Sequence, residues 1–254
     1  MLLSVRGAIG ATLLAGTALS AAPAFAQDAE APKEITVTGS AAVTSDYRFR
    51  GVSQSGGDVA IQGGITVSHA SGFYVGTWGS SIDLGSLYGS TELDLFGGWT
   101  GALTSGLTTD VGLLYYAYPN GTGGDSEFFE PYASVTGQVG PGKLKVGATY
   151  AWKQSALPNF AGNRKSDNLY VYGNLDVAIP STPLTVSGHL GYTDGALAPS
   201  YYSTSDRTGL DWSIGASATV YGPLSLSVSY VGVTGPSVDG YTDDTVVATL
   251  TASF

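Results

Sequence analysis

The chain has 254 residues, of which 43% are hydrophobic and only 12% charged, and it contains no cysteine. The charged fraction is about half that of soluble proteins, and the 37 glycines and 16 tyrosines favour β-structure with tight turns over helices. The lack of cysteine excludes disulfides and thiolate metal sites, and the formal net charge of −10 disfavours nucleic acid as a partner.

The first 26 residues have the features of a cleaved secretory signal peptide. An apolar run of small residues follows Arg6, and Ala24 and Ala26 form a small-x-small cleavage pattern. The run is shorter than the roughly 20 residues that span a bilayer, which disfavours a membrane anchor. Loss of Arg6 with the leader leaves 9 basic and 20 acidic side chains, a formal net charge of −11. We expect an exported protein with a flexible lead-in at residues 27–34.

From Ile35 onward, apolar and polar residues alternate with a period of two, which places successive strand side chains on opposite faces. The pattern is clearest in the last strand, where every second residue from Phe254 back to Val246 is apolar and the others are mostly hydroxyl-bearing. Either face of the segment at 73–83 could be its apolar one. The alternation predicts about twelve strands, at 35–50, 59–67, 73–83, 90–101, 105–118, 127–138, 143–153, 168–179, 184–194, 208–220, 224–233 and 242–254.

The connections between these strands alternate in length. The short ones are rich in turn-forming residues and lie at 70–72, 103–106, 140–142, 180–183 and 221–223. The long ones lie at 51–58, 84–89, 119–126, 154–167, 195–207 and 234–241. Outer-membrane barrels show this asymmetry, with short periplasmic turns and long extracellular loops, whereas a β-sandwich has less reason to sort its loops by end. The sequence therefore predicts an all-β fold, an antiparallel transmembrane β-barrel formed by residues 35–254 in the bacterial outer membrane.

The aromatic residues of the apolar face gather at two levels, as in the aromatic girdles at membrane interfaces. Those near the long loops are Tyr47, Phe49, Tyr115, Tyr150, Trp152, Tyr192, Trp212 and Tyr230, and those near the short turns are Trp99 and Phe254.

The opposite face carries the ionisable residues. A Lys or Arg facing lipid near the midplane costs about 2–4 kcal/mol, so these residues are expected to face the lumen. They are Asp46, Arg48, Arg50, Glu92, Asp94, Asp110, Glu130, Lys143, Lys145, Asp176, His189 and Asp211. Paired charges that fill the interior and a narrow water-filled pore both fit this set. Small inward residues favour the pore, and the acidic excess favours cations over anions.

No catalytic, metal or cofactor site is predicted. His69 lies at a turn and His189 at a lumenal position, and neither stands in a pattern with a nucleophile and a carboxylate. Two acidic loop groups lack the ordered spacing of a calcium loop. They are Asp125, Glu127 and Glu130, and Asp239, Asp243 and Asp244. The expected partners are membrane lipid, small polar solutes or ions, and the barrel-assembly machinery through the terminal strand.

Several strings resemble the TorF family of predicted proteobacterial porins, which is also described as a Gly- and Trp-containing domain of unknown function. They are D-Y-R-F-R-G-V-S-Q-S at 46–55, I-Q-G-G at 61–64, S-G-F-Y-V-G-T-W-G-S-S-I-D at 71–83 and E-L-D-L-F-G-G-W at 92–99. The resemblance covers most of the mature chain and implies an outer-membrane barrel with porin activity. Ser81 and Ile82 stand where the family pattern has Asn and Val, and the resemblance supplies no solute and no functional residues.

We therefore expect a porin that gives passive diffusion of small polar solutes or ions. Arg48 and Arg50 are predicted to face Asp46, Glu92 and Asp94 across the lumen near its external end, and the loops at 154–167 and 195–207 to fold into the mouth. Two alternatives stay open. One is a closed structural or surface-interaction barrel without conductance, and the other is a barrel enzyme that acts on lipid through His189.

Overall fold

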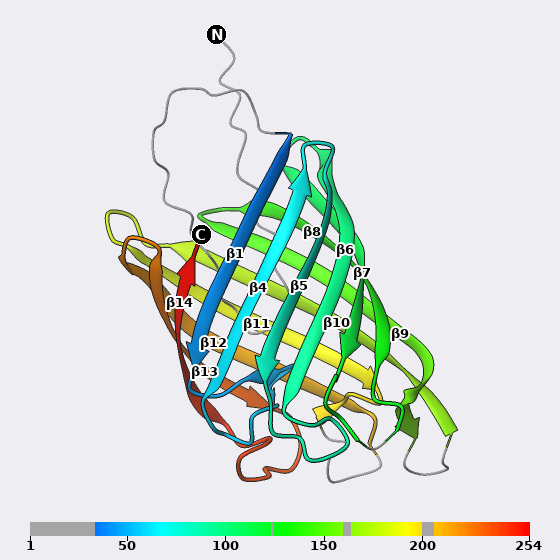
Figure 1. Cartoon of the computed structure of the whole chain (residues 1–254). Coiled ribbons are helices and arrows are strands. Elements are labelled where there is room, and N and C mark those ends of the chain that lie inside the picture. Colours follow the sequence, from blue (N-terminus) through cyan, green and yellow to red (C-terminus); the bar gives the residue numbers. More distant parts are fainter. Residues whose placement is uncertain (1–33, 123, 160–163, 200–205) are drawn as a thin grey trace.

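The computed structural model describes residues 34–122, 124–159, 164–199 and 206–254. The predicted signal peptide and residues 27–33 of the predicted lead-in lie outside this part of the chain. Within it, twelve strands close into an antiparallel barrel (Figure 1), so the predicted fold is confirmed. No helix in the described ranges is long and apolar enough to cross a membrane.

Each barrel strand pairs with the next one in sequence, and β1 closes the ring by pairing with both β4 and β14. The N–H of Gly39 donates to the carbonyl oxygen of Phe254 at 2.8 Å, and the N–H of Phe254 donates back at 2.9 Å. The barrel strands are β1 (Ile35–Thr44), β4 (Ala60–His69), β5 (Phe73–Ser81), β6 (Thr91–Thr104), β7 (Leu107–Ala117), β8 (Phe128–Val139), β9 (Gly142–Asn159), β10 (Arg164–Ala178), β11 (Leu184–Gly195), β12 (Thr208–Tyr221), β13 (Leu224–Val233) and β14 (Thr245–Ser253).

The two ends of the barrel differ as the connection lengths predict. Tight turns join the strands at the end where β1 begins, at the top and left of Figure 1, and longer segments join them at the other end. Gly72 shows why glycine occupies such turns. Its φ is +96°, and a Cβ there would lie 2.2 Å from the carbonyl oxygen of Thr100.

The long connection predicted at 154–167 is wrong in its bounds, because β9 continues to Asn159 and β10 already begins at Arg164. Gln154 explains part of this extension. Its side chain accepts from the N–H of Phe129 and donates to the carbonyl oxygen of Phe129, both at 2.8 Å. The side chain thus continues the hydrogen bonding between neighbouring strands beyond the barrel rim.

The outer face is apolar and the inner face polar. Leu, Val and Ile at alternate positions of every barrel strand point outward and are exposed in the isolated chain, as membrane-facing residues must be. The ambiguous strand β5 is also settled. Phe73 and Val75 are 63% and 62% exposed on the outside, whereas Tyr74 and Trp78 are buried inside.

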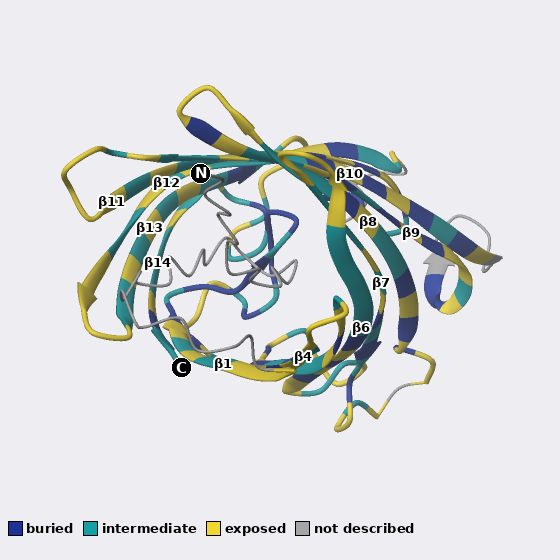
Figure 2. Ribbon diagram, turned by 90° about the horizontal axis from the view of Figure 1, so that it is seen from above, coloured by how far each residue is buried: buried dark blue, intermediate teal, exposed yellow. Residues whose placement is uncertain are grey.

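The first predicted strand is wrong beyond Thr44, where β1 ends. Residues 45–59 leave the wall, and residues 46–55 of this segment fold into the barrel, where β2 (Arg48–Phe49) pairs with β3 (Val52–Ser53). Figure 2, seen from above, shows buried chain inside the ring of strands. The hairpin turns at Arg50 and Gly51, whose φ angles are +50° and +77°. We call residues 45–59 the plug.

Candidate functional site: a plugged lumen with two unlike walls

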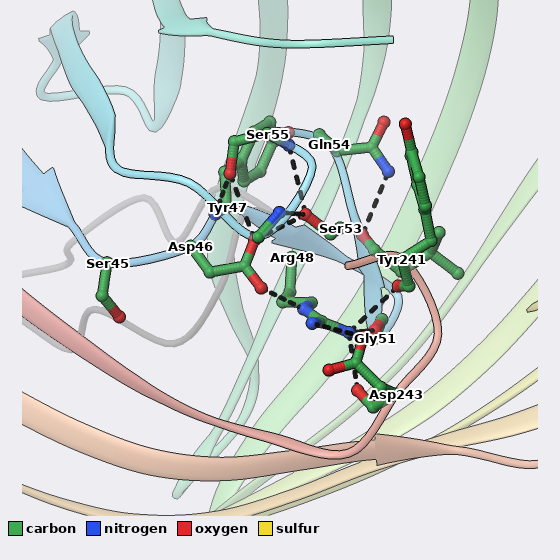
Figure 3. A network of polar contacts seen from close by, with 12 residues as sticks. Ser45, Asp46, Tyr47, Arg48, Gly51, Ser53, Gln54, Ser55, Tyr241 and Asp243 are labelled. Atoms are coloured by element: carbon green, nitrogen blue, oxygen red, sulfur yellow. Dashed lines mark hydrogen bonds and ion pairs between the residues drawn. The ribbon is translucent and has the colours of Figure 1, made fainter. Parts of the chain in front are cut away.

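Asp46 holds the plug together (Figure 3). Its carboxylate accepts from Arg48 Nε at 2.5 Å, from Ser53 Oγ at 2.6 Å and from Ser55 Oγ at 3.1 Å. Carboxylates at a turn commonly organise the backbone in this way. Asp46, which the strand alternation predicts on the barrel wall, therefore stabilises the segment that leaves the wall.

Arg48 ties the plug to the connection between β13 and β14. Its Nη1 donates to the carbonyl oxygens of Gly51 at 3.2 Å, Tyr241 at 3.0 Å and Asp243 at 2.9 Å (Figure 3). With Asp46 on its Nε, the guanidinium of Arg48 is balanced by the plug itself and by one neighbouring loop. It does not stand as a free charge in the lumen.

Arg50 joins the plug to the opposite wall. Its Nη2 lies 2.7 Å from each carboxylate oxygen of Glu130 on β8 and 3.1 Å from the hydroxyl of Thr149 on β9. The guanidinium also lies over the ring of Tyr170, 4.3 Å from its centroid. Burial acts to lower the pKa of Arg50, but the Glu130 carboxylate and the neighbouring Tyr116 and Tyr170 together leave the pKa raised. Arg50 is therefore a permanently charged anchor.

Tyr47 makes a second contact with the same wall. Its hydroxyl donates to Glu92 on β6 at 2.9 Å, and its ring meets the ring of Trp78 edge-on at 5.4 Å. Burial, together with the charge of Glu92, raises the pKa of Tyr47, so the hydroxyl stays a neutral donor. The girdle predictions for Tyr47 and Phe49 are wrong, because both residues pack inside the barrel.

The wall that receives these contacts is densely filled. We define the packed wall as the inward side chains of β5 to β10. Tyr116 and Phe128 stack at 4.4 Å, and Tyr74 Oη lies 2.5 Å from both Asp110 Oδ1 and Tyr132 Oη. Its main side chains are Tyr74, Trp78, Glu92, Asp94, Phe96, Asp110, Leu114, Tyr116, Phe128, Glu130, Tyr132, Thr149, Tyr170 and Tyr172.

The other side of the lumen carries small hydroxyl residues. We define the hydroxyl wall as the inward side chains of β13, β14, β1 and β4, chiefly Ser225, Ser227, Ser229, Thr249, Thr251, Thr38, Ser40, Thr44 and Thr66. Between this wall and the plug lies a cavity of about 100 Å³, lined in part by Asp46, Tyr47, Arg48 and Trp78. One water needs about 10–15 Å³ by the same measure, so the cavity holds several.

His189 belongs to a hydrogen-bonded cluster on β10, β11 and β12. Its Nε2 lies 2.7 Å from Asp211 Oδ1 and 2.9 Å from Tyr170 Oη, and its Nδ1 lies 2.5 Å from Asn174 Oδ1. Among the described residues, none of these partners is a serine. The cluster orients Tyr170, the ring beneath Arg50, and does not form a nucleophile and base pair at the lipid boundary.

The structure brings together only some of the predicted lumenal residues. Arg50 pairs with Glu130, and Arg48 pairs with Asp46. These ion pairs differ from the predicted arrangement, in which both arginines also face Glu92 and Asp94 across the lumen. Lys143, Lys145 and Asp176 lie on inward positions nearer the short turns.

In the described ranges, no group of three or more acidic or histidine side chains could hold a metal ion. Of the loops at 154–167 and 195–207, which are predicted to fold into the mouth, residues 160–163 and 200–205 lie outside the described residues.

The other predicted girdle residues are placed on the outer face. Near the long loops these are Tyr115, Tyr150, Trp152, Tyr192, Trp212 and Tyr230, and near the short turns Trp99 and Phe254. Phe129 joins the group near the long loops, since its ring stacks on that of Trp152 with the centroids 6.1 Å apart. Phe129, Tyr116 and Tyr170 are not among the predicted site residues. The inward positions of Tyr116 and Tyr170 in the alternation were a usable signal.

Residues 26–254 match a family described as "Bacterial protein of unknown function (Gcw_chp)". The chain belongs to this family. That description carries no porin assignment, so the TorF resemblance stays a prediction. No curated protein sequence matches the chain.

Solved outer-membrane barrels share the fold of this Gcw_chp chain. A NanC porin structure aligns with a TM-score of 0.57 at 11% identity, covering 86% of this chain and 99% of the porin. The KdgM porin gives 0.51 at 14% identity, covering 86% and 98%. An outer membrane channel from Pseudomonas putida F1 gives 0.53 at 9% identity, covering 89% and 99%. At these identities the likeness establishes the fold, a closed barrel of the outer-membrane type.

Proposed function

We propose that this protein is an outer-membrane channel through which small polar solutes or ions diffuse passively. The observation that carries the proposal is the cavity of about 100 Å³ between the plug and the hydroxyl wall. The plug is anchored by Arg50 and Tyr47 to the packed wall, so the hydroxyl wall stays partly uncovered. Solutes pass along that wall, and the plug sets the width of the path.

Three further observations support a porin. The TorF-like strings imply porin activity, and two of the solved barrels with the same fold are named porins. Acidic side chains outnumber basic ones among the predicted lumenal residues, which favours a modest cation preference. Phe254 ends the chain one residue after β14, and we propose this strand as the contact for the barrel-assembly machinery.

A planar bilayer tests the proposal directly. Purified protein in a KCl gradient should give discrete conductance steps and a reversal potential displaced toward that of potassium. A preparation that is folded, as shown by a heat-dependent shift of its gel mobility, and yet silent at all voltages would contradict the proposal.

A closed barrel without conductance is the second candidate, and the buried ion pair between Arg50 and Glu130 favours it. The same bilayer experiment decides between the two. A lipid hydrolase is disfavoured, since His189 faces the lumen and is held by Asp211, Asn174 and Tyr170. Unchanged lipid turnover in a His189→Gln variant would exclude that role.

A further inference from the structure

The chemistry of the cavity beside the plug is that of a neutral site, although two charged residues line it. Asp46 accepts from Arg48, Ser53 and Ser55, so both of its carboxylate oxygens are engaged. Arg48 in turn donates to Asp46, to three backbone carbonyls and, at 3.4 Å, to the carboxylate of Asp243. A charged ligand would find no unpaired opposite charge here and would have to give up its hydration without compensation.

The cavity instead offers hydroxyl groups with unused hydrogen-bonding capacity. Ser40, Ser227, Ser229 and Thr251 line it, and their hydroxyls have no hydrogen-bond partner in the described part of the protein. Each hydroxyl is one donor and a two-fold acceptor. Thr251 is 7% exposed, lies inside the barrel and lines this cavity.

Trp78 adds an aromatic surface and a further donor. Its side chain lines the cavity and is 8% exposed, and its indole N–H has no acceptor within the residues that the structure describes. Tyr47 holds the ring in place by its edge-on contact. An indole N–H without an acceptor, on a ring that lines a cavity, can donate a hydrogen bond to a ligand oxygen.

From this arrangement we infer that the cavity binds a small uncharged polyol, a molecule with several hydroxyls and a short carbon skeleton. Its hydroxyls pair with Ser40, Ser227, Ser229 and Thr251, and its C–H surface lies near Trp78. The inference deepens the proposed function and rests on it for one point only, namely that the bound polyol is also a solute that the channel carries. Binding itself is measurable without transport.

Saturation-transfer NMR on the purified full barrel in detergent micelles tests the site with three small probes. Erythritol has four hydroxyls and no charge. 1,2-Dimethoxyethane is an uncharged ether without donors, and glycerate is a hydroxylated anion. We expect saturable transfer to erythritol and none to the ether or to glycerate. Equal transfer to erythritol and the ether would overturn the inference, because hydroxyl recognition would then play no part.

A variant that removes hydroxyls at nearly constant volume sharpens the test. Ser40→Ala, Ser229→Ala and Thr251→Val together should weaken erythritol binding about tenfold, the effect of losing one or two neutral hydrogen bonds. The matched control is Thr185→Val, Ser213→Ala and Ser217→Ala, three inward hydroxyl residues of β11 and β12 outside the cavity lining. The control should bind like the wild type, and both variants should retain the heat-dependent gel shift.

The outcomes separate the two claims. If erythritol binding is the same in the cavity variant as in the wild type, the polyol site is wrong even where KCl conductance is present. If binding falls in the cavity variant while the wild type shows no conductance, the site stands and the channel proposal fails. Erythritol flux into liposomes that falls with binding, while KCl conductance is kept, supports both.

Discussion

The packed wall and the hydroxyl wall obey the same strand alternation but fill the lumen differently. The packed wall projects Tyr, Phe, Trp and carboxylates inward, and the hydroxyl wall projects mainly Ser and Thr. Eight-stranded barrels are filled by side chains and barrels of sixteen or more strands leave a channel. This twelve-stranded barrel combines the two solutions, with one half of its interior filled and the other half partly open.

The difference also explains where the plug lies. Arg50 and Tyr47 are buried, and burial of their polar groups is tolerable only with partners. Glu130 and Glu92 on the packed wall supply them, whereas the hydroxyl wall carries no carboxylate in its lining of the cavity. The plug therefore packs against the packed wall, and part of the hydroxyl wall stays open to solvent in the lumen.

Removal of the plug should have the largest effect. Thr44 and Ala60 are register partners on β1 and β4, so an Asn-Gly turn can replace residues 45–59 without disturbing the barrel. Because the plug no longer narrows the lumen, conductance in planar bilayers should rise several-fold. An unchanged conductance in a folded variant would mean that the plug does not limit the path.

Narrowing the hydroxyl wall should have the opposite effect. Thr249→Trp places a large ring in the cavity lining, and most of the conductance should be lost. Ala248→Trp is the matched control, because the neighbouring side chain faces the membrane on the same strand. If both variants conduct alike, solutes do not follow this wall.

Breaking the anchor should change stability more than conductance. Arg50→Met alone leaves Glu130 buried without its partner and should cost about 3–5 kcal/mol, whereas Arg50→Met with Glu130→Leu should recover much of the loss. The free energies of unfolding from urea titrations in micelles give this comparison. A double variant no more stable than the single one would show that Arg50 and Glu130 are not coupled.

The smallest effect is expected from Glu92→Gln with Asp94→Asn. Both carboxylates are buried in the packed wall, at 2% and 4% exposure, so they act on ions only through the long-range potential. The reversal potential in a KCl gradient should move a few millivolts toward zero. Asp239→Asn, on the exposed connection between β13 and β14, is the control and should leave it unchanged. A reversal potential that stays at the wild-type value would exclude these two carboxylates as a source of cation preference.

The barrel was predictable from the sequence because each strand carries its own alternation and each connection its own length. The plug was not, because Tyr47 and Phe49 continue the alternation of β1 although the chain has already left the wall. What redirects the chain is a set of contacts distant in sequence, such as that between Arg50 and Glu130, which are 80 residues apart. The run S-G-G-D at 55–58 and two arginines beside an apolar strand were the local signs of a folded-in loop.

The most direct test of the two-wall lumen uses the absence of cysteine from the chain, which lets single cysteines be introduced without background. With Ser229→Cys, a charged, membrane-impermeant thiol reagent should react quickly and reduce the KCl current. With Leu114→Cys, at a site 4% exposed in the packed wall, the same reagent should react slowly and leave the current unchanged. Equal reaction rates at the two positions, or faster reaction at position 114, would contradict the account.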